Sequence, residues 1–218
     1  MSTAILVLNA GSSSLKFSLF SEEDEELRVR LRGEIEALYT SPHFFAYDPK
    51  RVLRHEQSWG DGARLGHDGA IAYLLEFLRG ELGANVLGAV GHRVVHGGAD
   101  FFAPVRVTAD IIAALERLVP LAPLHQPHNL APIRIIAQRA PELLQIACFD
   151  TAFHRTQPRV AETFALPRNL IDRGVRRYGF HGLSYEYIAS ALPRFDPVAA
   201  AGRVVVAHLG TARACARW

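Results

Sequence analysis

Small residues with hydroxyl groups fill the segment Asn9–Lys16, whose sequence is NAGSSSLK. Gly11 allows the backbone to turn tightly and to approach a ligand closely. Exposed N–H groups and the hydroxyls of Ser12, Ser13 and Ser14 could then surround a phosphate, and Lys16 would add a positive charge. The G-x-x-x-x-G-K-[ST] spacing of a Walker A loop is not present, so an ordinary hairpin turn remains the alternative.

A second segment, HRVVHGG, carries Arg93 at the end of an apolar run. A buried guanidinium needs an anionic partner, and its planar fork fits a carboxylate or a phosphate. An ion pair with an internal Asp or Glu is the structural alternative. Zinc is disfavoured, because the sequence shows no convergent set of ligands with a carboxylate or thiolate partner. We therefore expect structural or hydrogen-bonding roles for His92, His96, His125 and His128.

Two further segments contain residues suited to catalysis. CFDTAFH places Asp150 where a predicted strand leaves the sheet, and a carboxylate there can hold a metal-bound water or a nucleophile, or orient a cation. A turn cap is its alternative role. YGFHGLS places His181 between glycines, so its ring could line a cleft, although a lone histidine is usually structural. Ser12, His181 and Asp150 make a weak hydrolase triad, since no G-x-S-x-G elbow is present.

The elements that would position these residues are predicted from apolar spacing and caps. Strands are predicted at Ala4–Asn9, Leu15–Phe20, within Leu27–Val52, and at Val86–His96, Gln145–Phe149 and Arg203–His208. Helices are predicted at His67–Leu82 with Asp68 as cap, Thr108–Leu118 with Thr108 as cap, Pro132–Arg139 and Ser184–Leu192, and a loop is expected at Leu121–Asn129. An antiparallel start followed by strand–helix alternation predicts an α/β domain with a mixed sheet.

Composition narrows the class of protein further. The 218 residues include 24 Lys and Arg against 22 Asp and Glu, which gives no whole-chain electrostatic case for nucleic-acid binding. A hydrophobic fraction of 49% excludes wholesale disorder. Cys148 and Cys215 alone make no disulfide framework. No apolar stretch has the length of a membrane span and no signal peptide is evident, so we expect a soluble cytoplasmic protein.

Six segments, taken together, resemble the acetate/propionate kinase family, in which they occur in the same order: VLNAGSSSLKFSLF, GHRVVHGG, PLAPLH, CFDTAFH, YGFHGLSY and VVVAHLG. The resemblance implies an actin-like ATPase fold of two related domains with a cleft between them. It also implies Mg²⁺-dependent phosphoryl transfer between ATP and a small carboxylate. Acetate, giving acetyl phosphate and ADP, is the expected substrate, and propionate is the alternative.

The resemblance also assigns roles to individual residues. Asn9 would associate with Mg²⁺, and Arg93 would hold the substrate carboxylate or the transferring phosphoryl group. Asp150 would be an acid/base-like catalytic residue, and His181 would stabilise the transition state. The ATP phosphates would contact Ser12, Ser14 and Lys16, together with a second loop that begins at His208, Leu209 and Gly210. The acyl methyl group would lie in an apolar pocket of Val95, Leu124 and Phe180.

The resemblance covers about the first half of a full-length member, so we expect one N-terminal domain at 1–210. The family continues after HLG with Asn-Gly-Ala-Ser, whereas residues 211–218 read TARACARW. These eight residues can be encoded by codons that, with one base added in front and read in the new frame, spell the family sequence. We therefore expect 211–218 to be a frameshifted tail. The gene's nucleotides test this, and the idea fails if no homologous second half lies downstream in another frame.

The activity of the chain by itself is a separate expectation. A kinase that closes two domains around its substrates cannot assemble its site from one of them. We therefore expect the 218-residue chain alone to be inactive or nearly so, and an inactive remnant without catalysis is the non-enzymatic alternative. The resemblance implies a homodimer for full-length members, but it does not settle whether this chain keeps the dimer contacts.

Overall fold

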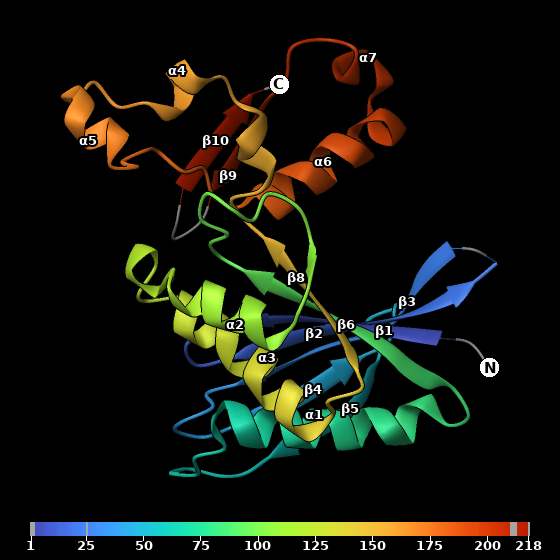
Figure 1. The fold of residues 1–218 in the computed structure, drawn as a ribbon. Coiled ribbons are helices and arrows are strands. Elements are labelled where there is room, and N and C mark those ends of the chain that lie inside the picture. The colour runs from blue at the N-terminus through green and yellow to red at the C-terminus, as the bar shows by residue number, and fades with distance from the viewer. Residues whose placement is uncertain (1–2, 25, 210–212, 218) are drawn as a thin grey trace. The chain divides into compact units, whose positions relative to one another are not determined.

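A computed structural model describes residues 3–24, 26–209 and 213–217, the last range by its backbone alone (Figure 1). The chain divides into two compact units. Unit 1 consists of Met1–Val94 and Pro104–Cys148, and unit 2 consists of Val95–Ala103 and Phe149–Trp218. The expectations for Gly210, Thr211, Ala212 and Trp218 fall outside the described residues. The single domain predicted at 1–210 and the frameshifted tail stay predictions.

The described strands of unit 1 form a mixed sheet in the order β5-β4-β3-β2-β1-β6-β8-β7. Neighbours from β1 to β5 pair antiparallel, as do β7 and β8, whereas β1 and β6 pair parallel. The mixed sheet confirms the predicted fold class. The strands are β1 (Thr3–Ala10), β2 (Leu15–Glu23), β3 (Glu26–Glu36), β4 (His43–Tyr47), β5 (Leu53–Ser58), β6 (Val86–Val94), β7 (Val105–Arg106) and β8 (Leu144–Phe149), whose last residue belongs to unit 2.

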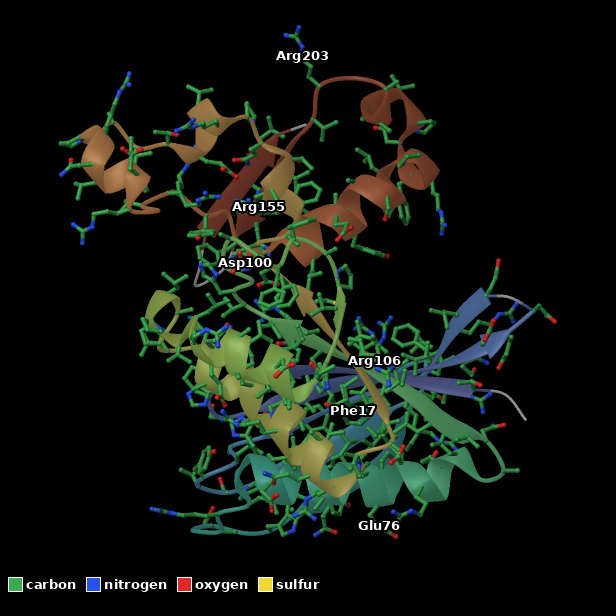
Figure 2. The ribbon with its side chains drawn as sticks, viewed as in Figure 1. Phe17, Glu76, Asp100, Arg106, Arg155 and Arg203 are labelled. Atoms are coloured by element: carbon green, nitrogen blue, oxygen red, sulfur yellow. The ribbon has the colours of Figure 1, made fainter. Side chains whose placement is uncertain are left out.

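Alternation of buried and more exposed side chains along the strands builds the core of unit 1. In β1 every second side chain from Ala4 to Ala10 is buried, because successive side chains of a strand point to opposite faces. The buried face packs against α1 (Gly66–Leu82). Phe44 is fully buried and its ring stacks on Phe17 at 5.7 Å. Figure 2 shows Phe17 among the packed side chains of this unit and Glu76 on the outer side of α1.

The starts of two helices test the predicted caps. Thr108 is the N-cap of α2 (Ala109–Glu116), and its hydroxyl accepts from the Ile111 N–H at 3.3 Å, which confirms the prediction. Asp68 is not the cap of α1, so that prediction is wrong. The N–H groups of Leu65 and Gly66 both donate to the Leu38 carbonyl at 2.9 Å, so a backbone acceptor does the work of a capping side chain.

The third helix, α3 (Gln126–Arg139), begins six residues before the predicted Pro132. The expected loop therefore ends earlier, after a short turn of helix, η1 (Val119–Leu121). Pro127 lies in the first turn, where a missing N–H costs nothing because it would have no partner within the helix. Pro132 is tolerated inside the helix, whose buried Ile133 and Ile136 supply tertiary packing. α3 packs on α1, β1 and β6.

Unit 2 contains short helices and a two-stranded antiparallel sheet. Its longest helix, α6 (Gly182–Phe195), extends beyond the predicted Ser184–Leu192 at both ends. Its strands are β9 (Val205–Leu209) and β10 (Arg213–Arg217). The remaining elements are η2 (Phe153–Thr156), α4 (Arg159–Glu162), α5 (Arg168–Asp172) and α7 (Pro197–Ala200). Within the described parts of the whole chain, no helix combines the length and apolarity that crossing a membrane requires.

Candidate active site

The predicted phosphate-binding turn joins β1 to β2 in unit 1. The register pairs Ala10 with Leu15, and the Gly11 N–H donates to the Ser14 carbonyl at 2.8 Å. Gly11, Ser12 and Ser13 are exposed and Ser14 is half-buried. Lys16 follows on β2 and lies 3.5 Å from the Glu34 carboxylate, with 61% of its side chain exposed. The hydroxyls of Ser12 and Ser13 are therefore open to a ligand.

The carbonyls of this turn are hydrogen-bonded to surrounding segments. Asn129 on α3 donates its side-chain amide to the Ala10 carbonyl at 2.7 Å. His67 on α1 donates from Nε2 to the Gly11 carbonyl at 2.9 Å, and the Leu38 N–H donates to the Ser13 carbonyl at 3.0 Å. Carbonyl oxygens carry partial negative charge and would repel an anion. Because these carbonyls are hydrogen-bonded to surrounding residues, the arrangement favours the binding of an anion at the turn.

Arg93 and Asn9 come together at the same end of the sheet. The Arg93 Nη1 donates to the Asn9 Oδ1 at 3.0 Å across the paired strands β1 and β6. Arg93 is half-buried, and one of its contacts is this neutral amide oxygen; the anionic partner that the sequence indicated stays a prediction. β6 ends at Val94, so the predicted strand to His96 is two residues too long.

Two histidines of unit 1 are held neutral by burial. The pKa of His92 is lowered to about 4, chiefly by burial, although the hydrogen bond to Gln145 opposes the shift. That bond joins His92 Nε2 to Gln145 Oε1 at 2.8 Å. Burial also lowers the pKa of His67, opposed by the bond to Gly11 and aided by the nearby His128, whose ring stacks on it at 5.7 Å. The expected hydrogen-bonding role of His92 is confirmed.

In unit 2, Asp150 lies in the turn that follows β8 and is 1% exposed. Its carbonyl accepts from the Gly182 N–H at 2.8 Å, at the start of α6. A Cβ added at Gly182 would lie 2.3 Å from that carbonyl oxygen, so only glycine fits. The next residue, Thr151, accepts from the Gly97 N–H at 3.0 Å. These bonds join three of the sequence segments singled out for chemistry.

His181 adopts a left-handed backbone conformation, with φ of 58°, immediately before α6. Its ring stacks on His208 with centroids 4.1 Å apart and planes 6° apart. The structure thus brings together two candidate residues from separate segments. Leu209, the next residue of β9, is 77% exposed. Gly210 lies outside the described residues, so its predicted phosphate contact stays a prediction.

Two histidines that the sequence analysis did not place in the site support the YGFH segment. His154 donates from Nε2 to the Phe180 carbonyl at 2.9 Å, and Gly179 packs directly on its ring. His96 Nδ1 accepts from the Gly98 N–H at 2.8 Å, which confirms its expected hydrogen-bonding role. The His96 ring also meets the edges of Tyr178 and Phe180. His154 belongs to the CFDTAFH segment, so its closeness to Asp150 in the sequence was the one signal that could have marked it as a site residue.

The residues of the predicted apolar pocket are divided between the two units. Val95 is 9% exposed and Phe180 is half-buried, and both belong to unit 2. Leu124 belongs to unit 1 and is 77% exposed. The pocket itself stays a prediction.

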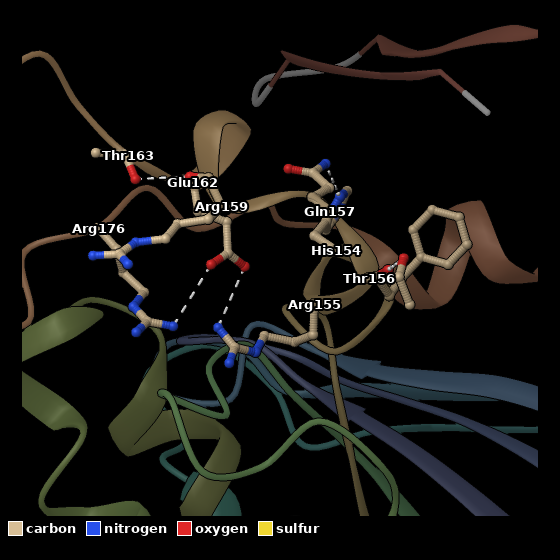
Figure 3. Close-up of polar contacts among 9 residues, drawn as sticks. His154, Arg155, Thr156, Gln157, Arg159, Glu162, Thr163 and Arg176 are labelled. Carbon is tan, nitrogen blue, oxygen red and sulfur yellow. Dashed lines mark hydrogen bonds and ion pairs between the residues drawn. The ribbon is translucent and has the colours of Figure 1, made fainter.

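An ion-pair cluster holds the segment that precedes YGFH (Figure 3). The Glu162 carboxylate lies 3.4 Å from Arg155 Nη1 and 3.7 Å from Arg176 Nη1, and its side chain is 18% exposed. The Arg177 N–H donates to the Glu162 carbonyl at 2.8 Å. α4 is therefore fastened to the chain two residues before Gly179, which fixes the approach of the segment that carries Phe180 and His181.

Comparison with known proteins assigns the family. The mixed α/β fold is that of acetate and propionate kinases: a crystal structure of Porphyromonas gingivalis acetate kinase matches 99% of this chain and 54% of its own, with a TM-score of 0.80 and 33% identity. A Francisella tularensis propionate kinase structure matches 98% of this chain and 54% of its own, with a TM-score of 0.82 and 32% identity. The sequence model of the acetokinase family matches residues 4–216, and the chain belongs to that family.

Curated relatives agree with this assignment. An acetate kinase of Rhodopseudomonas palustris strain TIE-1 is 52% identical over 213 residues, which are 96% of this chain and 53% of the relative. An acetate kinase of Rhizobium meliloti is 47% identical over 208 residues, covering 95% of this chain and 53% of the relative. The chain therefore spans about half the length of the curated relatives it matches.

Proposed function

We propose that this chain supplies the N-terminal half of an acetate kinase, which transfers a phosphoryl group between ATP and acetate and forms acetyl phosphate and ADP. The observation that carries the proposal is the 3.0 Å contact between Arg93 and Asn9, next to an exposed serine turn, in a chain of the acetokinase family. Phosphoryl transfer asks a protein mainly for positioning and for positive charge around the transferred group.

The proposed roles in unit 1 follow from this chemistry. Ser12, Ser14 and Lys16 would bind ATP phosphates, and Arg93 would hold the acetate carboxylate or the transferring phosphoryl group. Within the described residues no group of three or more His, Cys, Asp or Glu side chains could hold a metal ion, so Mg²⁺ would arrive with ATP. Asn9 Oδ1 accepts one hydrogen bond, from Arg93, and its second lone pair would associate with Mg²⁺ there. Mg²⁺ supplies charge neutralisation on the phosphates.

The proposed roles in unit 2 rest on Asp150, His181 and the loop that begins at His208 and Leu209. Acetate is already a carboxylate at neutral pH, so the reaction needs no strong base. Asp150 would therefore orient a cationic group and not remove a proton. The His181 ring would donate to the phosphoryl oxygens as charge develops, with its orientation supported by the stack on His208. The apolar pocket of Val95, Leu124 and Phe180 would receive the acetate methyl.

Propionate is the second candidate substrate, because one of the matching structures is a propionate kinase. Acetate and propionate differ by one methylene group, which is worth about 1–3 kcal/mol in an apolar pocket. A comparison of kcat/KM for the two acids decides between them. A preference for propionate would replace acetate in the proposal without changing the reaction.

The test uses the chain joined to the C-terminal half of the Rhodopseudomonas palustris relative, with acyl phosphate trapped as its hydroxamate. Arg93→Ala should lower kcat/KM by at least about 100-fold, since it removes positive charge that acts on the transferred group or substrate. Arg203→Ala is the matched control, because Arg203 is exposed (Figure 2). Equal activity of the two variants would contradict the role given to Arg93.

A further inference from the structure

We propose that His67 is a positioning residue that, with Tyr39 behind it, holds the Gly11–Ser14 turn open to receive the phosphates of ATP. The inference rests on the proposed function, because that function makes the turn a phosphate site. It adds two residues that lie outside the six segments of the sequence analysis. Both belong to unit 1, as does the whole turn.

The hydrogen bonds of the turn are unusual for a tight hairpin. Such a turn commonly closes with the N–H of its fourth residue donating to the carbonyl of its first. Here the Gly11 N–H donates to the Ser14 carbonyl at 2.8 Å, but the Gly11 carbonyl accepts from His67 Nε2 at 2.9 Å. Within the described residues, no bond from the Ser14 N–H to Gly11 is formed. His67 thus takes the acceptor that would close the turn.

Tyr39 fixes how His67 makes this bond. The Gly11 carbonyl can only accept, so His67 Nε2 must carry a hydrogen. In the neutral ring Nδ1 is then an acceptor, and the Tyr39 hydroxyl lies 2.9 Å from it and donates. His67 is 6% exposed, and burial favours this neutral form. Both ring nitrogens are satisfied, so the tautomer and the ring plane are set.

The backbone around Tyr39 connects the same elements. Leu38, fully buried, donates its N–H to the Ser13 carbonyl at 3.0 Å. The Leu38 carbonyl accepts from Leu65 and Gly66 at the start of α1, the two residues directly before His67. The segment after β3 therefore fastens both the tip of the turn and the helix that carries His67. This double attachment holds both partners of the His67–Gly11 bond, the helix and the turn, in place.

The experiment compares His67→Ala, His67→Gln and Tyr39→Phe with the unaltered sequence, each in the chain joined to the C-terminal half of the Rhodopseudomonas palustris relative, using MgATP and inorganic tripolyphosphate as calorimetric probes. His55→Ala is the matched control, because His55 also bonds a tyrosine, Tyr73, at 2.8 Å in the same unit. Loss of one hydrogen bond predicts binding weaker by about 3- to 10-fold in His67→Ala. His67→Gln should restore part of the binding affinity, since its amide can donate to Gly11. The affinity of Tyr39→Phe should lie between those of His67→Ala and the unaltered protein.

Amide exchange measured by NMR tests the same idea without ligand. In His67→Ala the Ser14 N–H should exchange at least several-fold more slowly, because the freed Gly11 carbonyl becomes its acceptor. Unchanged Ser14 exchange overturns the role of His67 whether or not the chain binds phosphate. Binding that weakens equally in His55→Ala also overturns it, as a general loss of stability. An unaltered joined protein that binds neither probe overturns the phosphate role of the turn, and the proposed function of this loop with it.

Discussion

The guanidinium of Arg93 shows how a single side chain connects two strands to a site. It reaches from β6 to the Asn9 oxygen on β1, and the parallel pairing of these strands sets the two residues close together. The sequence identified both residues, but only through separate segments 84 positions apart. Their contact depends on strand pairing, which neither segment encodes by itself.

A buried histidine provides a prediction at the same scale. His92 Nδ1 has no hydrogen-bond partner within the described residues, and its Nε2 donates to Gln145. Protonation would bury a charge and a donor without an acceptor, which is why the pKa of His92 falls to about 4. The unfolded chain, with a histidine pKa near 6.5, binds the proton more readily. Stability should therefore be fully present above about pH 6.5 and should decrease as the pH falls toward 4.

Urea unfolding measured at several pH values checks this. One proton taken up on unfolding corresponds to about 1.4 kcal/mol per pH unit across that window. His92→Asn keeps an amide donor for Gln145 and removes the titrating ring, so its profile should be flatter. His67 and His96, whose pKa values are also lowered, will leave part of the slope. An identical slope in the variant and the unaltered chain would contradict the assignment to His92.

At the scale of elements, the sequence predicted best where a local signal decides the structure. A continuous apolar run identified β1, and the Thr108 cap marked the start of α2. It did less well where tertiary contacts decide. α1 begins on the carbonyl of Leu38, which lies 27 positions before Leu65. α3 runs through Pro132, which locally opposes a helix interior. The polar edge strand β5 carried no alternating apolar signal and was missed.

The junction between Asp150 and α6 gives a prediction for an element. Gly182→Ala would place a methyl group 2.3 Å from the Asp150 carbonyl oxygen, so the start of α6 must move. We expect a loss of about 1–3 kcal/mol in stability and a disturbed His181 ring. Urea unfolding and the NMR signals of the His181 and His208 rings measure the two effects.

Gly202→Ala is the control for this substitution, because the nearest atom to its added Cβ would lie 3.5 Å away, in the same unit. It should leave the stability within about 0.5 kcal/mol of the unaltered chain. Similar losses in both variants would show that the close approach at Gly182 does not explain the effect.

At the scale of the whole molecule, the family was predictable because six short segments occur in order along the chain. The chain nevertheless corresponds to 53% of the Rhodopseudomonas palustris relative. Composition and periodicity carried no information on the supporting residues His67, Asn129 and His154, since each acts on a backbone carbonyl brought near by folding. Such contacts join segments as far apart as 119 positions.

The most direct measurement is acetyl phosphate formation from ATP and acetate by the chain joined to the C-terminal half of that relative, with the 218-residue chain alone beside it. The account predicts acetate-dependent acetyl phosphate from the joined protein and little or none from the chain alone, since closing both halves around the substrates assembles the site. A joined protein that folds and binds MgATP but phosphorylates neither acetate nor propionate would contradict the account.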